Sequence, residues 1–175
     1  MRSGKLQLVS AILAFTLVWL CIRFPYEMLG VVEKVFGNPN EVDPLTLHIH
    51  GEFVESNLGT AVEPDGSVTV RLIAQQFNFV PECALVPTDR PIHFRITSAD
   101  VVHRFTISGT DRVLEVVPGH VSEGQYEFSK PGQYKTPCHE FCGPGHYDMR
   151  SRVVVVSRDQ FPSSKPEERL GCAAP

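Results

Sequence analysis

The stretch P-C-H-E-F-C-G-P-G-H-Y-D-M, residues 137–149, gathers metal-binding side chains in one short segment. Its two cysteines, two histidines and one methionine are soft or borderline ligands suited to copper or zinc. Gly143, Pro144 and Gly145 lie among them and favour a loop over a helix. A loop can turn several donors towards one point, whereas a strand sends alternate side chains to opposite faces. The stretch therefore predicts a metal-binding loop that the rest of the chain holds in place.

Two simpler interpretations of this loop compete with copper. Cys138 and Cys142 could form a disulfide outside the cytosol. They could also bind a structural zinc ion together with two histidines. Neither interpretation explains Met149, because methionine is a poor zinc ligand and a good copper ligand. The donor set therefore favours copper.

The N-terminal segment predicts a membrane anchor. Residues 6–24 are uncharged before Arg23, and as a helix they reach about 28 Å, enough to cross the hydrocarbon core of a bilayer. Arg2 and Lys5 precede this run and favour a cytoplasmic N-terminus. No small-x-small cleavage site follows it, so we expect residues 1–26 to be an uncleaved, single-pass anchor in the plasma (inner) membrane. The rest of the chain would then lie on the outer, periplasmic side.

Composition limits the remaining possibilities. A chain of 175 residues, 42% hydrophobic and 21% charged, fits one small globular domain plus an appendage. The net charge of −4 argues against a nucleic-acid partner. Five cysteines make an odd number, which argues against a complete disulfide framework and leaves Cys83 and Cys172 without an assigned role.

Alternating apolar and polar residues predict short β-strands from Ser67 onward. No helical period is sustained there, and turn residues separate the runs. Many short strands at this spacing indicate an all-β antiparallel sandwich or barrel over residues 67–160. We expect an irregular linker over 27–66 and a polar C-terminal tail over 161–175, disordered from Ser163. The expected strands span residues 67–74, 92–97, 101–108, 113–117, 125–128, 133–136 and 152–156.

A further histidine is needed to complete two metal positions, and His103 is the candidate. It lies in S-A-D-V-V-H-R-F, at the start of an expected strand. In blue-copper proteins, the site combines two histidines, one cysteine and an axial methionine. In a Greek-key barrel, one of those ligands comes from an earlier strand and the rest from a late loop. This chain has one cysteine more than a mononuclear site uses, and two thiolates can bridge two copper ions.

These motifs resemble subunit II of the haem–copper cytochrome c oxidases. The residues that carry the resemblance are Ser98–His103, Val117–Gly119, Lys130–Tyr134 and Cys138–Met149. The resemblance implies a cupredoxin-like Greek-key barrel and a dinuclear, mixed-valence copper centre bridged by the two thiolates. The implied ligands are His103, Cys138, the backbone carbonyl of Glu140, Cys142, His146 and Met149, with His103 and Met149 on one copper and His146 and Glu140 on the other. The His139 ring is expected to point to solvent.

The resemblance also implies a function. Such a subunit takes electrons from a soluble donor, a cytochrome c or a cupredoxin, and passes them to haem in subunit I. Haem and a further copper in that partner reduce dioxygen. Many family members have two membrane helices and a Trp-rich run that receives the electron. This chain has one apolar segment, and the matching run is Q-Q-F-N-F, residues 75–79, so that Phe77 or Phe79 would replace the tryptophan.

Three other functions share parts of the motif. A thioredoxin-like copper chaperone for oxidase assembly carries Cys-x3-Cys, but with Pro after the second Cys, where this chain has Gly143. A nitrous-oxide reductase has the same copper loop, but its large catalytic domain does not fit in 175 residues. A stand-alone, membrane-tethered copper electron carrier remains open, because the ligand set permits it.

Overall fold

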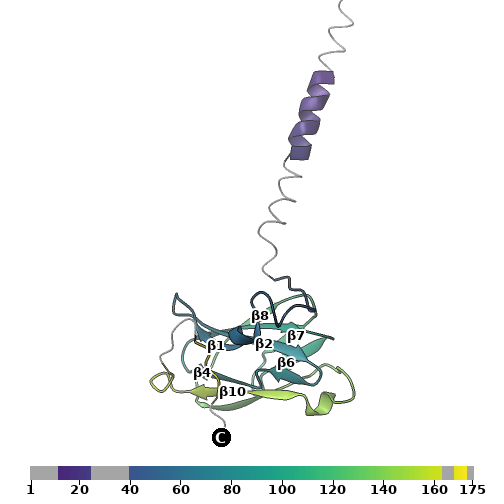
Figure 1. The fold of residues 1–175 in the computed structure, drawn as a ribbon. Helices are drawn as coiled ribbons and strands as arrows, with labels where there is room; N and C mark the ends of the chain where they lie inside the picture. Colours follow the sequence, from purple (N-terminus) through teal and green to yellow (C-terminus); the bar gives the residue numbers. More distant parts are fainter. Residues whose placement is uncertain (1–11, 25–39, 163–167, 173–175) are drawn as a thin grey trace, which may run out of the picture. The chain divides into compact units, whose positions relative to one another are not determined.

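The structure, a computed structural model, describes residues 12–24, 40–162 and 168–172, which belong to two units divided after Pro39. The first unit contains a helix over residues 12–24 with exposed side chains (Figure 1). The other residues of the expected anchor, and residues 27–39 of the expected linker, lie outside the described residues. Among the residues described, no helix has the length and apolar character needed to cross a membrane.

The second unit is built from strands, as the alternation predicts (Figure 1). The described part of this unit also has two short 3-10 helices, η1 (Glu55–Asn57) and η2 (His146–Asp148). Within residues 40–162 the strands are β1 (Gly59–Val62), β2 (Val68–Gln75), β3 (Asn78–Val80), β4 (Cys83–Pro87), β5 (Pro91–Ser98), β6 (His103–Thr106), β7 (Val113–Val116), β8 (Ser122–Glu127), β9 (Gly132–Pro137) and β10 (Arg150–Val156).

The strands form two larger sheets and a hairpin. One sheet has the order β1-β2-β5-β8, with β3 also paired to β2, and the other has the order β4-β10-β9. Strands β6 and β7 form the hairpin. The expected antiparallel pairing holds for the other strand pairs, but β2 pairs with β5, and β4 with β10, in parallel. The reason is topological, because the chain leaves the first sheet after β3, adds β4 to the second sheet and then returns to form β5.

The main core holds the apolar faces of these strands. Val68, Val70 and Leu72 of β2 are buried, as are Ile92 and the other alternating apolar residues of β5. The predicted alternation is confirmed there. Burying such side chains is the main driving force of folding, worth about 1.5–3 kcal/mol for each large aliphatic residue.

The segment before β1 covers the outer face of β2. Leu47, Phe53 and Leu58 form a second buried cluster with Ile73 of β2 and Val121. Because both faces of β2 are covered, it is buried almost throughout, unlike a strand with one solvated face. Part of the chain expected to be an irregular linker therefore contributes to the core.

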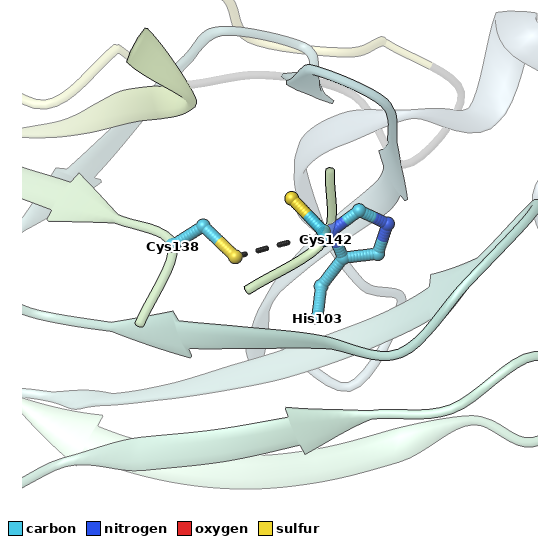
Figure 2. Close-up of side chains that lie close together, drawn as sticks. All are labelled: His103, Cys138 and Cys142. Carbon is cyan, nitrogen blue, oxygen red and sulfur yellow. Dashed lines mark hydrogen bonds between the residues drawn. The ribbon is translucent and has the colours of Figure 1, made fainter. Parts of the chain in front are cut away.

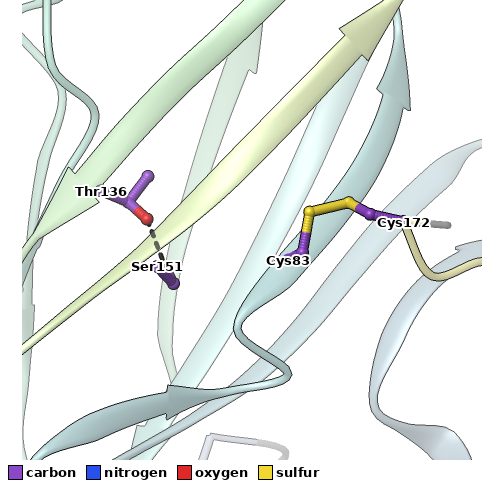
Figure 3. The surroundings of a disulfide bond; sticks show 4 residues. All are labelled: Cys83, Thr136, Ser151 and Cys172. Carbon is purple, nitrogen blue, oxygen red and sulfur yellow. Dashed lines mark hydrogen bonds between the residues drawn. A yellow bond between two sulfur atoms is a disulfide. The ribbon is translucent and has the colours of Figure 1, made fainter. Parts of the chain in front are cut away.

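The C-terminal segment is also held against the domain. Leu170 exchanges backbone hydrogen bonds with Thr60 of β1, and Gly171 bridges to Ala84 of β4. A disulfide joins Cys172 to Cys83 at the start of β4, with the two Cα atoms 5.7 Å apart (Figure 3). The prediction of a disordered tail is therefore wrong for residues 168–172. Residues 163–167 and 173–175 lie outside the described part.

Candidate metal centre

The predicted metal loop runs between two paired strands. The register of β9 and β10 places Pro137 opposite Arg150, and the Cys138 N–H donates to the Met149 carbonyl at 3.1 Å. The two ends of the loop are thus hydrogen-bonded to each other. A bridge between Cys138 and Phe105 of β6 joins the first end to the strand that begins with His103. The two segments predicted to supply ligands are therefore held side by side.

The side chains converge on two cysteine sulfurs. Cys138 Sγ lies 3.9 Å from His103 Nδ1 and 3.3 Å from the Glu140 carbonyl oxygen. Cys142 Sγ lies 3.6 Å from His146 Nδ1 and 3.5 Å from Met149 Sδ. The ligand atoms of His103, Cys138 and Cys142 all lie within 4.8 Å of one another (Figure 2). The structure thus brings together all the ligands that the sequence predicted.

These separations fit a metal site. Two ligand atoms bound at 2.0–2.3 Å in tetrahedral geometry lie about 3.5 Å apart, so little movement is needed to bind an ion. Cys138 and Cys142 are free thiols, and their sulfurs face His103 and Glu140 and His146 and Met149, respectively. Met149 is 1% exposed with its sulfur against Cys142, which a structural zinc would leave unexplained. The donor set fits copper.

Asp100 fixes the orientation of the His103 ring. Its Oδ1 lies 2.8 Å from His103 Nε2, so the other ring nitrogen faces Cys138. Burial raises the pKa of the Asp100 carboxyl, but hydrogen bonds from His103 and from the N–H groups of Gln76 and Val101 outweigh it and hold the pKa below its usual value. An ionised carboxylate accepts the Nε2 hydrogen and leaves the Nδ1 lone pair for a metal. Sequence reasoning missed this role, although Asp100 lies three residues before His103.

Cys142 is a protonated thiol in the metal-free site. Burial, together with the neighbouring Cys138 thiol, raises the pKa of the Cys142 thiol to about 11. A protonated thiol avoids placing an unpaired charge among apolar residues. A metal ion that binds the Cys142 sulfur must therefore displace its proton.

Two residues before β3 pack onto the loop. The Gln76 side chain donates to the Cys142 carbonyl. The ring of Phe77 lies so close to Gly145 that a Cβ there would approach Phe77 Cδ2 to 2.5 Å. The glycines predicted to make the segment a loop thus also make room for Phe77. Phe79 is instead fully buried in the core, with its ring centroid 6.5 Å from that of His103.

The outer side of the site carries exposed aromatic residues. Phe141 is 70% and Tyr147 86% exposed, and their rings lie 5.8 Å and 5.5 Å from the half-buried ring of His146. The Glu140 carboxylate is 3.1 Å from Arg104 and turned to this ion pair, while its carbonyl faces Cys138. His146 is therefore the predicted ligand that reaches the surface.

Comparison with known proteins agrees with this site. The family model for the periplasmic domain of cytochrome c oxidase subunit II matches residues 68–157. A cytochrome c oxidase subunit 2 from Thermus thermophilus is 36% identical, over 88% of this chain and 90% of the relative. A second subunit 2 from the same species is 36% identical, over 68% of this chain and 88% of the relative.

A solved structure shares the fold. One chain of a haem–copper terminal oxidase dimer aligns with a TM-score of 0.51 and 24% identity, over 84% of this chain and 99% of that chain. With the sheets described above, this likeness confirms the expected all-β, cupredoxin-like fold. The family resemblance carried by the loop and by His103 is confirmed by the family model and the relatives, and the chain belongs to the cytochrome c oxidase subunit II family.

Proposed function

We propose that this oxidase subunit binds two copper ions between its metal loop and strand β6. The observation that carries the proposal is the convergence of nitrogen, oxygen and sulfur donors, 3.3–3.9 Å away, on two free, buried thiols. Two thiolates are one more than a mononuclear blue-copper site uses, which favours bridging. The proposed ligands are Cys138 and Cys142 for both ions, His103 and Met149 for one, and His146 and the Glu140 carbonyl for the other.

The protein's contribution to such a centre is rigidity. When bound, the two ions would supply a mixed-valence, one-electron redox couple shared through both thiolates. Cys138 is tied to Met149 and Phe105 through the backbone, and His103 to Asp100 through its ring. Ligands held by packed strands keep nearly the same geometry in both redox states. Relaying an electron requires no general base or nucleophile from this chain.

In this proposal the subunit receives electrons from a soluble donor, a cytochrome c or a cupredoxin, and delivers them to haem in subunit I for dioxygen reduction. Membership of the subunit II family, over 90% of a relative's length, supports this role. The exposed rings of Phe141 and Tyr147 beside His146 give an apolar surface of the kind enriched at protein interfaces. A partner that docks there would approach a ligand of the centre directly.

We further propose that residues 1–26 anchor the chain once in the plasma (inner) membrane, with the N-terminus cytoplasmic and the copper domain in the periplasm. The long apolar run supports the anchor. The disulfide between Cys83 and Cys172 supports an oxidising compartment for the domain, because such bonds are rare in the cytosol.

The alternatives differ in fold or in partner. A thioredoxin-like chaperone carries its motif at a strand-to-helix junction, whereas Cys138 and Cys142 here lie between two strands of a β-sandwich. A stand-alone carrier would use the same copper ligands without subunit I. Co-purification of tagged chain with a haem-containing subunit, in mild detergent, would distinguish it from an oxidase subunit.

Copper counting tests the proposed centre. Full-length protein in detergent should hold two copper ions per chain. Cys138→Ser should lose both, because its sulfur would bridge both ions. Cys21→Ser is the matched control, since Cys21 is exposed on the N-terminal helix and should leave copper unchanged. Retention of one ion by Cys138→Ser would contradict the bridging arrangement.

A further inference from the structure

A groove of about 660 Å³ opens beside the metal loop. It runs along β9 and β10 and reaches three of the proposed copper ligands. Its lining includes Lys135, Cys138, His139, His146, Met149 and Arg152. The groove therefore joins the surface to Cys138 and Met149.

The proposed ligands differ strongly in exposure. His103 is 0% exposed, Met149 1%, and Cys138 and Cys142 5% each. His139 is exposed and His146 half-buried, and both line the groove. An ion arriving from solvent therefore meets imidazole nitrogens before it meets any sulfur.

His139 is well placed for a first contact. It follows Cys138 directly, and its backbone N–H donates to the Arg104 carbonyl at 2.9 Å, which fixes the main chain at this point. Its side chain is exposed and is not one of the proposed copper ligands. Imidazole is a good ligand for copper, so this position suits capture better than permanent coordination.

We propose that this groove is the loading channel of the copper centre and that His139 captures incoming copper(I) and hands it to Cys138. The inference rests on the proposed copper centre. In the first step a ring nitrogen of His139 replaces one ligand of a copper(I) complex, and that ligand leaves to solvent. In the second step the Cys138 sulfur displaces His139, and the thiol proton leaves to solvent. Copper remains copper(I) throughout, so no oxidant or reductant is required.

The charge of the groove indicates which complexes it favours. Lys135, Arg150 and Arg152 line it, against the carboxylate of Glu82. A positively charged channel attracts anions and repels free cations. The groove should therefore accept anionic copper(I) complexes, such as those with chloride or thiolate ligands, more readily than the aqueous ion.

Loading kinetics test this proposal. Metal-free, full-length protein in detergent is mixed anaerobically with copper(I) held as its chloride complex, and thiolate-to-copper absorbance in the near ultraviolet is followed by stopped flow. His139→Ala should load roughly tenfold more slowly, because a ligand next to Cys138 raises the local copper concentration. His120→Ala is the control, since His120 is exposed and lies outside the lining of this groove. The final copper content of His139→Ala should match that of the unchanged protein.

Two variants that each remove one positive charge test the channel itself. Arg152→Gln should slow loading by the anionic complex about threefold, whereas Arg158→Gln, with the same charge change on an exposed residue beyond β10, should not.

Loading of His139→Ala at the unchanged rate would overturn the capture role. A lower final copper content in this variant would also overturn it, because His139 would then be a permanent ligand. Failure of the unchanged protein to bind copper would instead contradict the proposed centre.

Discussion

The Asp100 carboxylate lies 2.8 Å from His103 Nε2, on the opposite side of the ring from Cys138. Because the same carboxylate also accepts the N–H groups of Gln76 and Val101, it ties the His103 ring to two other points of the chain. A histidine held in this way presents one defined nitrogen to a metal.

Asp100→Ala should therefore weaken copper binding by about 10- to 100-fold, as the loss of such supporting contacts typically does. Asp100→Asn keeps an acceptor oxygen and should recover part of the loss. Competition with a copper chelator measures the affinity. Asp111→Ala, which removes an exposed carboxylate, is the control, and an Asp100→Ala affinity equal to that of this control would contradict the role.

The Cys83–Cys172 disulfide should stabilise the domain without changing the copper centre. It closes a loop with a sequence separation of 89 residues, and such bonds typically contribute about 2–4 kcal/mol. Cys172→Ser should lower the free energy of unfolding by this amount, measured by denaturant titration. Reductant should destabilise the unchanged protein but not Cys172→Ser. Equal sensitivity of both proteins to reductant would show that the bond is not formed.

Gly145→Ala should disturb the metal loop through Phe77. The added Cβ would lie 2.5 Å from Phe77 Cδ2, and overpacking of this kind typically costs about 1–3 kcal/mol. Gly171→Ala, where no atom lies within 4 Å of an added Cβ, is the matched control. Gly145→Ala should therefore hold less copper per chain, as measured by metal analysis. Adding Phe77→Ala to it should restore the copper content. A double variant no better than the single one would contradict the steric cause.

Glu52 should hold the segment before β1 against the first sheet. Its carboxylate accepts from Arg71 Nε at 2.9 Å and from Arg95 at 2.8 Å, and all three side chains are less than a quarter exposed. Glu52→Gln should lower the free energy of unfolding by about 1–3 kcal/mol, because two partly buried cations lose a charged acceptor. Glu55→Gln, on the neighbouring 3-10 helix, should change it little. Equal thermal stability of the two variants would exclude this role.

The sequence predicted β2 and β5 to β10 and missed β1, β3 and β4. Period-two alternation located β2 and β5 because their core-facing residues are Val, Leu, Ile and Phe. Strand β4 was missed because it ends at Pro87, a residue that signals a turn. It lies at the edge of its sheet, where proline is tolerated.

The residues that converge in the candidate metal site were predictable because their chemistry and spacing lie within one short segment and one preceding histidine. Their supports were not, because these depend on contacts that only the fold creates. Gln76, for example, reaches the Cys142 carbonyl across 66 residues of sequence. The disulfide, away from the site, was missed for the same reason, since Cys83 reaches Cys172 across 89 residues. Such partners carry no local pattern.

Electron paramagnetic resonance of the copper-loaded, full-length protein tests the central claim most directly. A centre bridged by Cys138 and Cys142 should show one unpaired electron shared equally between two copper nuclei, and Cys142→Ser should abolish that signal. The hyperfine pattern of an electron confined to a single copper nucleus in the unchanged protein would contradict the dinuclear centre.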